Sequence, residues 1–439
     1  MKRVLLVSLH FHPLPVVASE RSMAIARELS KLGWSVDVLT HNWQQKEGEW
    51  DPGLITERRT EDKEGMRIFR IGASNAWRKS EAANLPSLLA NIRTLWWWLL
   101  GWVDARAVSM DSHFAMDAWM KQHLPSSNYD LLLGVFSPHT HARLLRKWGR
   151  KCGIPVHLDF RDLWDNMVLS ESYRPKGSQK IRVPLVLHYW KKWLRTPISL
   201  STVSEPLAIY LREFSGKPCL AFATGYHSAN FPDTPVSKES FIVLHAGTLY
   251  NHQRLDIVTE GLTLFLASVQ DLRVSVEFSG AGRLGVFPLP GAYLSNPLEY
   301  LHERLSDPRV SMGPRVELAK VRKRMREASV LLMPTFPGSK GIYSGKLFDY
   351  LGAGRAILAC PNDGDVISET IAKSGCGTVC NTSEALAEAL KLRYAMWKQD
   401  PMSNSVESSP GREWYSQQSQ VKMLSEFLTN QLRVHPKKK

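Results

Sequence analysis

The N-terminal segment alternates between short, continuous apolar runs and a helix-spaced stretch. The runs RVLLVSL and WSVDVLT, at 3–9 and 34–40, have the composition of strands that are covered on both faces. Between them, 19–33 carries apolar residues at helical spacing and ends at Gly33. A strand–helix–strand unit of this kind favours a parallel sheet with helices on both sides, and so predicts a doubly wound α/β domain.

The same alternation continues along the chain in two series. In the first series, further strands are predicted at 66–71, 129–137, 155–160, 198–204 and 218–225, with a helix at 139–153. In the second series, strands are predicted at 241–249, 273–282, 330–336 and 355–361, with helices at 256–269, 316–328, 345–354 and 382–398. Each series therefore predicts one Rossmann-like domain whose ligands bind at the carboxyl ends of the strands.

The chain of 439 residues is too long for one core, because single cores stop growing near roughly 250–300 residues. A polar, proline-bearing stretch at 226–240 predicts the linker. We predict an N-terminal domain at 1–225, a C-terminal domain at 226–412, and a C-terminal helix and basic tail at 413–439. The two domains are expected to face each other across a cleft, with the last helix returning to the N-terminal domain.

Composition sets further limits on the chain. Hydrophobic residues make up 44% and charged residues 22%, as in ordinary globular proteins. The five cysteines are scattered, with no CxxC pair, which predicts reduced thiols and no metal site. The longest apolar run, at 95–103, is far shorter than the ~20 residues that span a bilayer, and no signal peptide is predicted. We therefore expect a cytoplasmic protein.

The net charge of +14 calls for an anionic partner, such as nucleic acid, an anionic membrane surface or an anionic substrate. Tryptophans stand beside cations in 91–106, 144–151 and 187–195. This combination suits the headgroup region of a membrane and favours peripheral contact with its inner face. The alternative is that these tryptophans belong to the core while the cations form a solvated helix face.

The segment IYSGKLFDYLGAGRAIL begins a helix with features that packing alone does not need. A helix starting near Gly345 would present free N–H groups to an anion, and Lys346 would add a positive charge. Asp349, one turn later on the same face, could accept hydrogen bonds from a ribose diol. Gly352 and Gly354 are expected to end the helix. Phosphate followed by ribose outlines a nucleotide.

Two other loops of the second half offer similar chemistry. A predicted strand ends at Gly247 and Thr248, and Arg254 opens the next helix, where it could bind two phosphate oxygens. Gly280 closes a third strand in the same way. The alternative is that these are turn glycines with surface cations, since glycine after a strand is common.

These residues carry a resemblance to a known family. The stretches GIPVHLDFRDLW, TVSEPL, HAGTLY, EFSGAG and SGKLFDYLGAGRAILA make the chain resemble the retaining GT-B glycosyltransferases of family 4 over nearly its whole length. The resemblance implies that Asp349 holds the donor ribose and that Arg254 and Lys346 contact the diphosphate. The residues expected around the nucleotide are Gly247, Thr248, Arg254, Gly280, Ser344, Gly345, Lys346, Leu347 and Asp349.

The sequence also departs from the family pattern. Gly341 stands eight residues before Asp349, where the family often has a glutamate near the donor sugar, and Asp349 replaces the usual glutamate. The frequent Gly-Gly pair of the first loop is absent, because Val16 and Val17 occupy this region. The resemblance therefore does not extend to recognition of the donor sugar.

The expected acceptor side lies in the N-terminal domain. Asp159, Arg161 and Asp162 follow a predicted strand and should open into the cleft. By resemblance, Asp159 would lie beneath the donor sugar, and Arg161 and Asp162 would organise the acceptor. The alternative is a structural ion pair. His10, His12, His139 and His141 lie near predicted strand ends, where a hydrogen-bonded loop histidine is the simpler interpretation.

The prediction is a glycosyltransferase that moves a sugar from a nucleotide diphosphate-sugar to a hydroxyl of a glycan or lipid-linked acceptor, in cell-surface glycan synthesis. The resemblance implies retention of configuration, no metal and no cofactor beyond the donor. Arg254 and Lys346 would neutralise the departing diphosphate. No nucleic acid is expected as partner. The alternatives are a sugar-nucleotide epimerase of the same fold and a non-enzymatic protein that binds nucleic acid or anionic surfaces.

Overall fold

The computed structural model describes residues 1–46, 49–51, 58–72, 109–136, 141–163, 177, 179–280, 296–338 and 340–437. The chain forms two compact units. Unit 1 is built from Met1–Asn166, Arg174–Thr224 and Val421–Lys439, and unit 2 contains Gly225–Gln420. Each unit holds a parallel sheet with helices around it, so the prediction of two Rossmann-like domains is confirmed.

Within its described residues, unit 1 has an eight-stranded sheet in the order β10-β9-β8-β7-β1-β2-β6-β5. Its strands are β1 (Arg3–Ser8), β2 (Ser35–His41), β5 (Arg58–Lys63), β6 (Met66–Ile71), β7 (Leu131–Phe136), β8 (Val156–Phe160), β9 (Ser199–Thr202) and β10 (Cys219–Ala221). All neighbours pair in parallel except β5 and β6, which are antiparallel. A separate hairpin joins β3 (Gln44–Lys46) and β4 (Glu49–Asp51).

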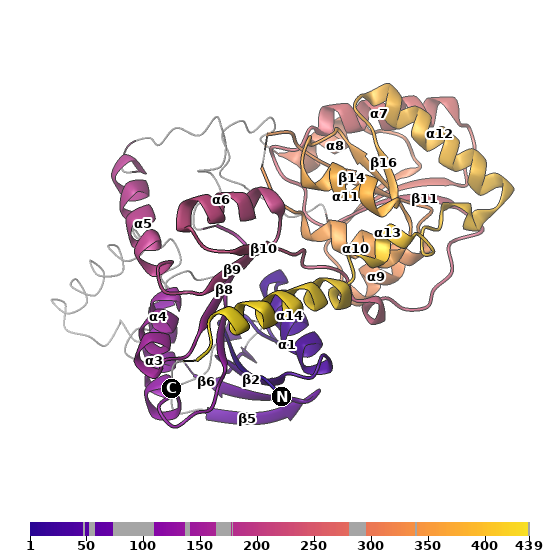
Figure 1. The fold of residues 1–439 in the computed structure, drawn as a ribbon. Helices are drawn as coiled ribbons and strands as arrows, with labels where there is room; N and C mark the ends of the chain where they lie inside the picture. The colour runs from indigo at the N-terminus through magenta and orange to yellow at the C-terminus, as the bar shows by residue number, and fades with distance from the viewer. Residues whose placement is uncertain are drawn as a thin grey trace. The chain divides into compact units, whose positions relative to one another are not determined.

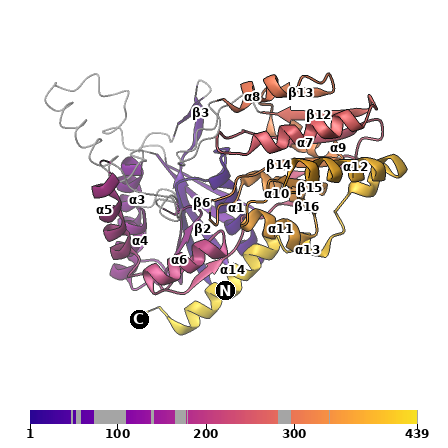
Figure 2. The ribbon, with the colours of Figure 1, turned by 90° about the horizontal axis from the view of Figure 1, so that it is seen from above.

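Helices cover both faces of this sheet (Figures 1 and 2). They are α1 (Val17–Lys31), α3 (Ser109–His123), α4 (His141–Cys152), α5 (Gln179–Trp193), α6 (Glu205–Ser215) and α14 (Gln417–Val434). On one face, Ile25 and Leu29 of α1 and Leu424 and Leu428 of α14 are fully buried in one apolar cluster with β1, β2 and β7. The other face carries α3 and α4. The last helix of the chain thus contributes to the core of unit 1.

The sheet of unit 2 is parallel throughout its described strands, in the order β13-β12-β11-β14-β15-β16. The strands are β11 (Phe241–Ala246), β12 (Val274–Ser279), β13 (Val310–Gly313), β14 (Val330–Pro334), β15 (Ala356–Cys360) and β16 (Gly377–Val379). The chain builds outward from β11 through β12 to β13, then returns to place β14 on the other side of β11. This reversal is the topological switch point at which doubly wound sheets bind ligands.

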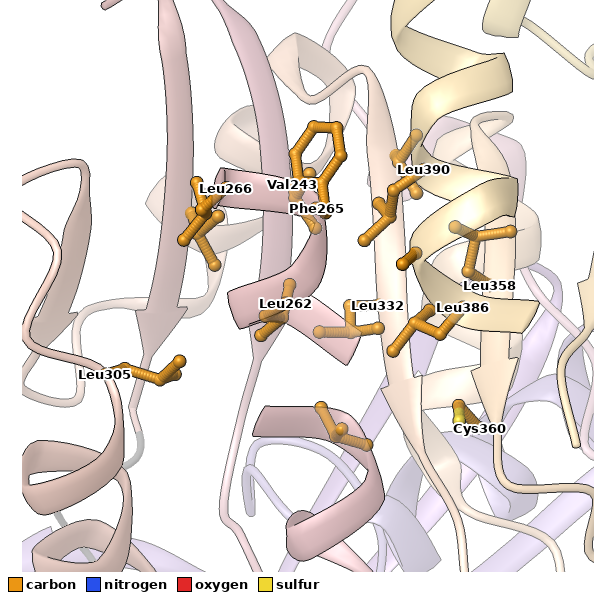
Figure 3. Close-up of a cluster of buried hydrophobic side chains, with 14 of the residues drawn as sticks. Val243, Leu262, Phe265, Leu266, Leu305, Leu332, Leu358, Cys360, Leu386 and Leu390 are labelled. Atoms are coloured by element: carbon orange, nitrogen blue, oxygen red, sulfur yellow. The ribbon is translucent and has the colours of Figure 1, made fainter. Parts of the chain in front are cut away.

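The helices of unit 2 also lie on both faces, with α7 and α12 on one side and α9 and α10 on the other (Figure 1). They are α7 (Leu255–Ser268), α8 (Pro297–Arg304), α9 (Leu318–Glu327), α10 (Gly345–Ala353), α11 (Val366–Ser374), α12 (Ser383–Gln399) and α13 (Pro410–Glu413), with short 3₁₀ turns at Ser228–Asn230 and Pro401–Asn404. Figure 3 shows the core between sheet and helices, where Leu262 and Phe265 meet Leu332 and Leu386.

The tryptophans within 144–151 and 187–195 lie in the interior. Trp148 and Trp190 are each 1% exposed and Trp193 is 7% exposed. The expectation that they sit among lipid headgroups is therefore wrong, and the alternative holds: they are core residues, because the apolar faces of α4 and α5 must pack against the rest of unit 1. The tryptophans of 91–106 lie outside the described residues.

The five cysteines are free thiols, and all but Cys152 are buried. Within the described part of the chain, no helix is both long and apolar enough to cross a membrane.

Helix α10 continues through Gly352 rather than stopping there, and ends at Gly354 in a left-handed conformation. A Cβ at Gly352 would lie 2.2 Å from the ring of Phe231, so close packing explains that glycine.

Candidate functional site

The loops that follow β11 and β14 meet at the switch point of unit 2. The side-chain amide of Gln253 donates to the carbonyl of Pro334 at 2.7 Å, and the backbone N–H of Arg254 lies 3.3 Å from the carbonyl of Thr335. These bonds join the end of the β11 loop to the end of β14. Because the strands are parallel, both loops lie at the same edge of the sheet, and α10 begins after the second loop.

Lys346, in the first turn of α10, reaches back to the β11 loop. Its Nζ donates to the carbonyl of Thr248 at 2.6 Å and lies 5.1 Å from the centre of the Tyr250 ring. Among the described residues, no carboxylate lies within ion-pair distance of this ammonium. Burial lowers the pKa of Lys346 to about 8. The site thus holds a desolvated positive charge that a bound anion would stabilise.

Gly247 makes room for this lysine. A Cβ at this position would lie 2.6 Å from Cε of Lys346, and the backbone has φ of +115°. Gly280, at the end of β12, has φ of +81°, and its N–H donates to the carbonyl of Gly313 at 3.0 Å. A Cβ at Gly280 would lie 3.5 Å from Cα of Gly247. Both predicted glycines therefore belong to one tightly packed pair of loops.

Helix α10 begins at Gly345, where the sequence placed its start, and the binding of an anion there stays a prediction. The Ser344 side chain does not cap the helix, and Gly345 is exposed. Leu347 is fully buried, and its N–H donates to the carbonyl of Ser344 at 3.1 Å, so its side chain serves the core. The hydroxyl of Tyr350 accepts from the N–H of Ala246 at 2.9 Å, which fixes the helix against β11.

Two buried histidines, His245 and His252, lie near Lys346 and were not predicted from the sequence. Burial is the main cause that lowers the pKa of His245 to about 3 and that of His252 to about 4, and the charge of Lys346 lowers both further. Both rings are therefore neutral at physiological pH. The strand and loop pattern alone could not identify them, because a histidine inside a predicted strand has no distinctive spacing.

The predicted ribose ligand Asp349 is already ion-paired. Its Oδ1 lies 3.2 Å from Nη2 of Arg322, which comes from α9. The Arg322 guanidinium also lies 5.5 Å from the centre of the Phe231 ring. A paired carboxylate can still accept bonds from a diol, because each oxygen has two lone pairs. Arg322 was not predicted, since it lies 27 residues before Asp349 in sequence.

Arg254, the second cation predicted for the diphosphate, stands at the N-terminus of α7 and pairs with a neighbour. Its Nη2 lies 2.7 Å from Oδ2 of Asp256, and this bond is the main cause that lowers the pKa of the Asp256 carboxyl. Both side chains are partly exposed. Arg254 and Lys346 therefore differ, because Lys346 lacks a described acidic partner and Arg254 has one.

A further carboxylate lies at the same edge of the sheet. Asp365, in the loop after β15, accepts a hydrogen bond from the backbone N–H of Gly341. Burial is the main cause that raises the pKa of this carboxyl. Gly341 stands where the resembling family often has a glutamate, and the Asp365 carboxylate lies against the backbone of this glycine.

In unit 1, Asp159 is 0% exposed, and both of its oxygens are engaged. Arg21 donates to it through Nε and Nη2, at 2.7 and 2.8 Å, and the Ser201 hydroxyl donates at 2.6 Å. This pairing with Arg21, rather than with Arg161, favours a structural role. The placement of Asp159 beneath a donor sugar stays a prediction.

Arg161 and Asp162 pair with each other just after β8. Nε of Arg161 donates to Oδ2 of Asp162 at 2.8 Å, and both side chains are partly exposed. Of the histidines considered near these strand ends, His10 is half-buried, His12 is exposed, His141 is buried, and His139 lies outside the described residues. Among the described residues at this edge, Arg161 and Asp162 form an ion pair that a ligand could reach.

Together, the loops of unit 2 can bind a phosphate and a ribose in sequence. Lys346 and the first turn of α10 supply positive potential, Gly247 leaves the space that the Lys346 side chain occupies, and Asp349 lies one turn along the helix. In the described part of the chain, no group of three or more His, Cys, Asp or Glu side chains is arranged to hold a metal ion.

No protein-family model matches the sequence, and neither does any curated protein. Solved structures do match. Sucrose-phosphate synthase from Thermosynechococcus elongatus is 16% identical with a TM-score of 0.58, covering 99% of this chain and 100% of that one. HepE from Anabaena, in complex with UDP-glucose, is 12% identical with a TM-score of 0.55, covering 99% and 100%.

A third match is WaaG, a glycosyltransferase involved in lipopolysaccharide biosynthesis, which is 14% identical with a TM-score of 0.53, covering 97% of this chain and 99% of that one. All of these matches extend over nearly the full length of both chains. The chain therefore has the GT-B fold that these glycosyltransferases share.

Proposed function

We propose that this protein is a retaining, metal-independent glycosyltransferase that moves a sugar from a nucleotide diphosphate-sugar to an acceptor hydroxyl. The observation that carries the proposal is the desolvated ammonium of Lys346, held on the Thr248 carbonyl where α10 begins. Such a charge suits a ligand that brings its own negative charge, and a nucleoside diphosphate has both the phosphates for Lys346 and the ribose for Asp349. The GT-B fold supports the same ligand class.

Each charged residue has a proposed role in the transfer. Lys346 and the N-terminus of α10 stabilise the diphosphate as it leaves, a preorganised electrostatic contribution. Arg254 turns from Asp256 to the diphosphate, and Asp349 accepts hydrogen bonds from the ribose while Arg322 orients it. In unit 1, Arg161 and Asp162 organise the acceptor, and Asp159 is proposed to act from beneath the sugar.

The proposal also covers the donor, the acceptor and the location. A UDP-sugar is the first donor to test, because HepE was solved with UDP-glucose. The acceptor is a glycan or lipid-linked oligosaccharide of cell-surface polysaccharide synthesis, at the cytoplasmic face of the membrane. WaaG, with its role in lipopolysaccharide biosynthesis, supports this acceptor class. Nucleic acid is not part of the proposal.

A thermal-shift panel of UDP-, GDP-, ADP- and dTDP-sugars tests the donor assignment. A ligand that binds only the native state stabilises it by about 2.7 kcal/mol at a hundredfold excess over Kd. One donor class should raise the melting temperature of the native protein, and Asp349→Ala should reduce this shift by about half or more. No shift with any nucleotide-sugar would overturn the proposal.

Incubation with the donor alone separates transfer from the epimerase alternative. A transferase leaves the sugar configuration of the donor unchanged, whereas an epimerase of the same fold yields an altered sugar without an acceptor. Binding to DNA that depends steeply on salt, and that Asp349→Ala leaves unchanged, would favour the nucleic-acid alternative instead.

A further inference from the structure

We propose that the exposed face of α5 in unit 1 docks on the anionic lipid headgroups of a bilayer. The three cations Lys191, Lys192 and Arg195 lie, with His188, around a hollow of about 270 Å³. All four side chains are exposed. We call this set the α5 basic surface. The inference rests on the proposed function for its membrane-bound acceptor, but the binding it describes does not depend on the donor site.

The cations of this surface lack an acidic partner among the described residues. Lys191, Lys192 and Arg195 line one hollow at the end of α5, so their charges lie close together. The positive charge also lies at the C-terminal end of α5, where the helix dipole favours cations. An external anionic group can therefore approach all three without displacing an existing ion pair.

The surrounding sequence keeps the potential positive. The segment 179–204 contains five lysines and arginines but no aspartate or glutamate. The potential at a charged surface extends over roughly a Debye length, about 8 Å at physiological ionic strength. With no acidic residue in the segment, nothing within it neutralises the α5 basic surface.

Exposed apolar side chains lie on the same helix. Ile181 is 66% exposed and Tyr189 is 38% exposed, whereas Val186 and Trp190 face the interior. The helix thus satisfies the core with one face and offers cations and apolar groups together on the other. This is the composition of helices that lie in the interface of an anionic membrane, where apolar side chains enter the headgroup layer and cations contact phosphates.

Helix α4 extends the basic area, since it lies beside α5 in both views (Figures 1 and 2). Arg143, Arg150 and Lys151 are exposed on α4, which has no acidic residue in its sequence. Nε of Arg146 donates to Oγ1 of Thr196 at 3.1 Å, and this bond connects α4 to the chain after α5. Lys147 of α4 is paired with Asp117 of α3, so the cations that α4 adds beside α5 are Arg143, Arg150 and Lys151.

This breadth favours a bilayer over a small soluble phosphate. Free phosphate would engage Lys191, Lys192 and Arg195 but would leave Ile181 and Tyr189 in water. A bilayer with anionic headgroups engages both kinds of side chain at once, and it offers many phosphates to the cations of α4 and α5 together. We therefore assign the surface to anionic lipid.

Vesicle co-sedimentation with the full chain tests the assignment. The native protein should bind vesicles of phosphatidylcholine mixed with phosphatidylglycerol, and binding should weaken with salt and be absent with phosphatidylcholine alone. Each basic residue near an anionic surface strengthens binding by roughly fivefold, so the triple variant Lys191→Gln, Lys192→Gln, Arg195→Gln should bind on the order of 100-fold more weakly. Ile181→Ser should weaken binding less.

A matched control carries the same loss of charge at exposed lysines elsewhere, as Lys238→Gln, Lys398→Gln, Lys422→Gln. This control should bind the mixed vesicles nearly as the native protein does. Equal binding by the α5 triple variant and the native protein, or equal loss in the control, would overturn the docking surface. Full competition by inorganic phosphate at the concentration of the lipid phosphate would also overturn it, in favour of a free-phosphate site.

The donor thermal shift separates this proposal from the proposed function. If the α5 triple variant keeps the nucleotide-sugar shift but loses vesicle binding, both proposals are supported. If native protein binds vesicles through α5 but no nucleotide-sugar shifts its melting temperature, the docking surface stands and the transferase proposal fails. If the shift is present and vesicle binding is not, only the docking surface fails.

Discussion

Nη2 of Arg322 lies 3.2 Å from Oδ1 of Asp349, so the carboxylate expected to hold a ribose has a cationic partner before any nucleotide arrives. The pair is partly buried between α9 and α10, and Arg322 is in turn packed over the ring of Phe231. Aspartate is one methylene shorter than the glutamate of the resembling family. The contact with Arg322 restrains this short carboxylate on the surface of α10.

Removing the carboxylate should cost more nucleotide affinity than removing its partner. Asp349→Ala loses charge-assisted bonds to the ribose, worth about 1.5–3 kcal/mol, and should weaken UDP binding by roughly 10- to 150-fold. Arg322→Gln keeps the carboxylate but loosens it, so a smaller loss is expected. Isothermal titration with UDP measures both.

The ion pair of Asp307 and Arg309 provides the control for these variants, because it lies in unit 2 but outside the candidate site. Asp307→Asn should leave UDP affinity unchanged. A larger loss in Arg322→Gln than in Asp349→Ala would mean that the arginine, not the aspartate, contacts the nucleotide.

Gly247→Ala should disable the phosphate loop by displacing Lys346. The new Cβ would lie 2.6 Å from Cε of the lysine, at a φ of +115° that side chains rarely adopt. Gly33→Ala is the matched control, since Gly33 lies in unit 1 and has a φ of +85° but no described atom within 4 Å of the added Cβ. Both variants should lose similar stability from backbone strain in thermal unfolding, but only Gly247→Ala should lose UDP binding. Equal UDP affinity in the two variants would show that Lys346 does not need this space.

The depressed pKa of Lys346 predicts a pH dependence of stability with a defined sign. The lysine has a pKa of about 8 in the folded chain and 10.5 as its ordinary value, so between these pH values the unfolded chain binds more protons. The free energy of unfolding of unit 2 should therefore rise from about pH 8 to about pH 10.5. Lys346→Met should lack this rise, and denaturant unfolding at several pH values measures it.

Deprotonation of Lys346 should lower the affinity for UDP, although it raises the free energy of unfolding. Phosphate favours the protonated lysine, so UDP binding above about pH 8 must take up a proton. Affinity should then fall by up to about tenfold per pH unit above 8 in the native protein, and remain flat in Lys346→Met. A flat profile in both would remove Lys346 from the phosphate site.

The buried pair of Arg21 and Asp159 should matter for stability. Breaking a buried ion pair by removing one partner typically costs about 3–5 kcal/mol, because it leaves an uncompensated charge inside the protein. Asp159→Ala should therefore lower the free energy of unfolding by about this amount, while the double variant Arg21→Met, Asp159→Leu should be less affected. A stable Asp159→Ala protein without transferase activity would instead support the chemical role.

The fold could be predicted from the sequence because its buried strands are continuous apolar runs. The strands predicted at 66–71 and 241–249 appear as β6 and β11, and the helix predicted at 256–269 appears as α7. Helix α5 was missed, since a proline at 184 interrupts its pattern. The short strand β16 was also missed, because three residues give no periodicity.

The candidate site was predictable only as a set of local motifs. Spacing along the chain placed Lys346 and Asp349 on one helix face, but it could not show that Lys346 reaches Thr248, 98 residues away. Sequence spacing also could not identify Arg322 or the neutral His245, because their environments arise from contacts between elements that are far apart in the sequence. It also made Arg161 the apparent partner of Asp159, whereas the structure pairs Asp159 with Arg21, 138 residues away.

Leu424 and Leu428 complete an apolar cluster whose other members come mainly from the first 140 residues of the chain. During synthesis, the ribosome has already released the strands of unit 1 and the whole of unit 2 before these leucines emerge. The domain made first is therefore finished only after unit 2, and the part of its sheet face that α14 covers stays uncovered until α14 has been made. A chaperone that shields apolar surface on nascent chains would have its longest task at this face.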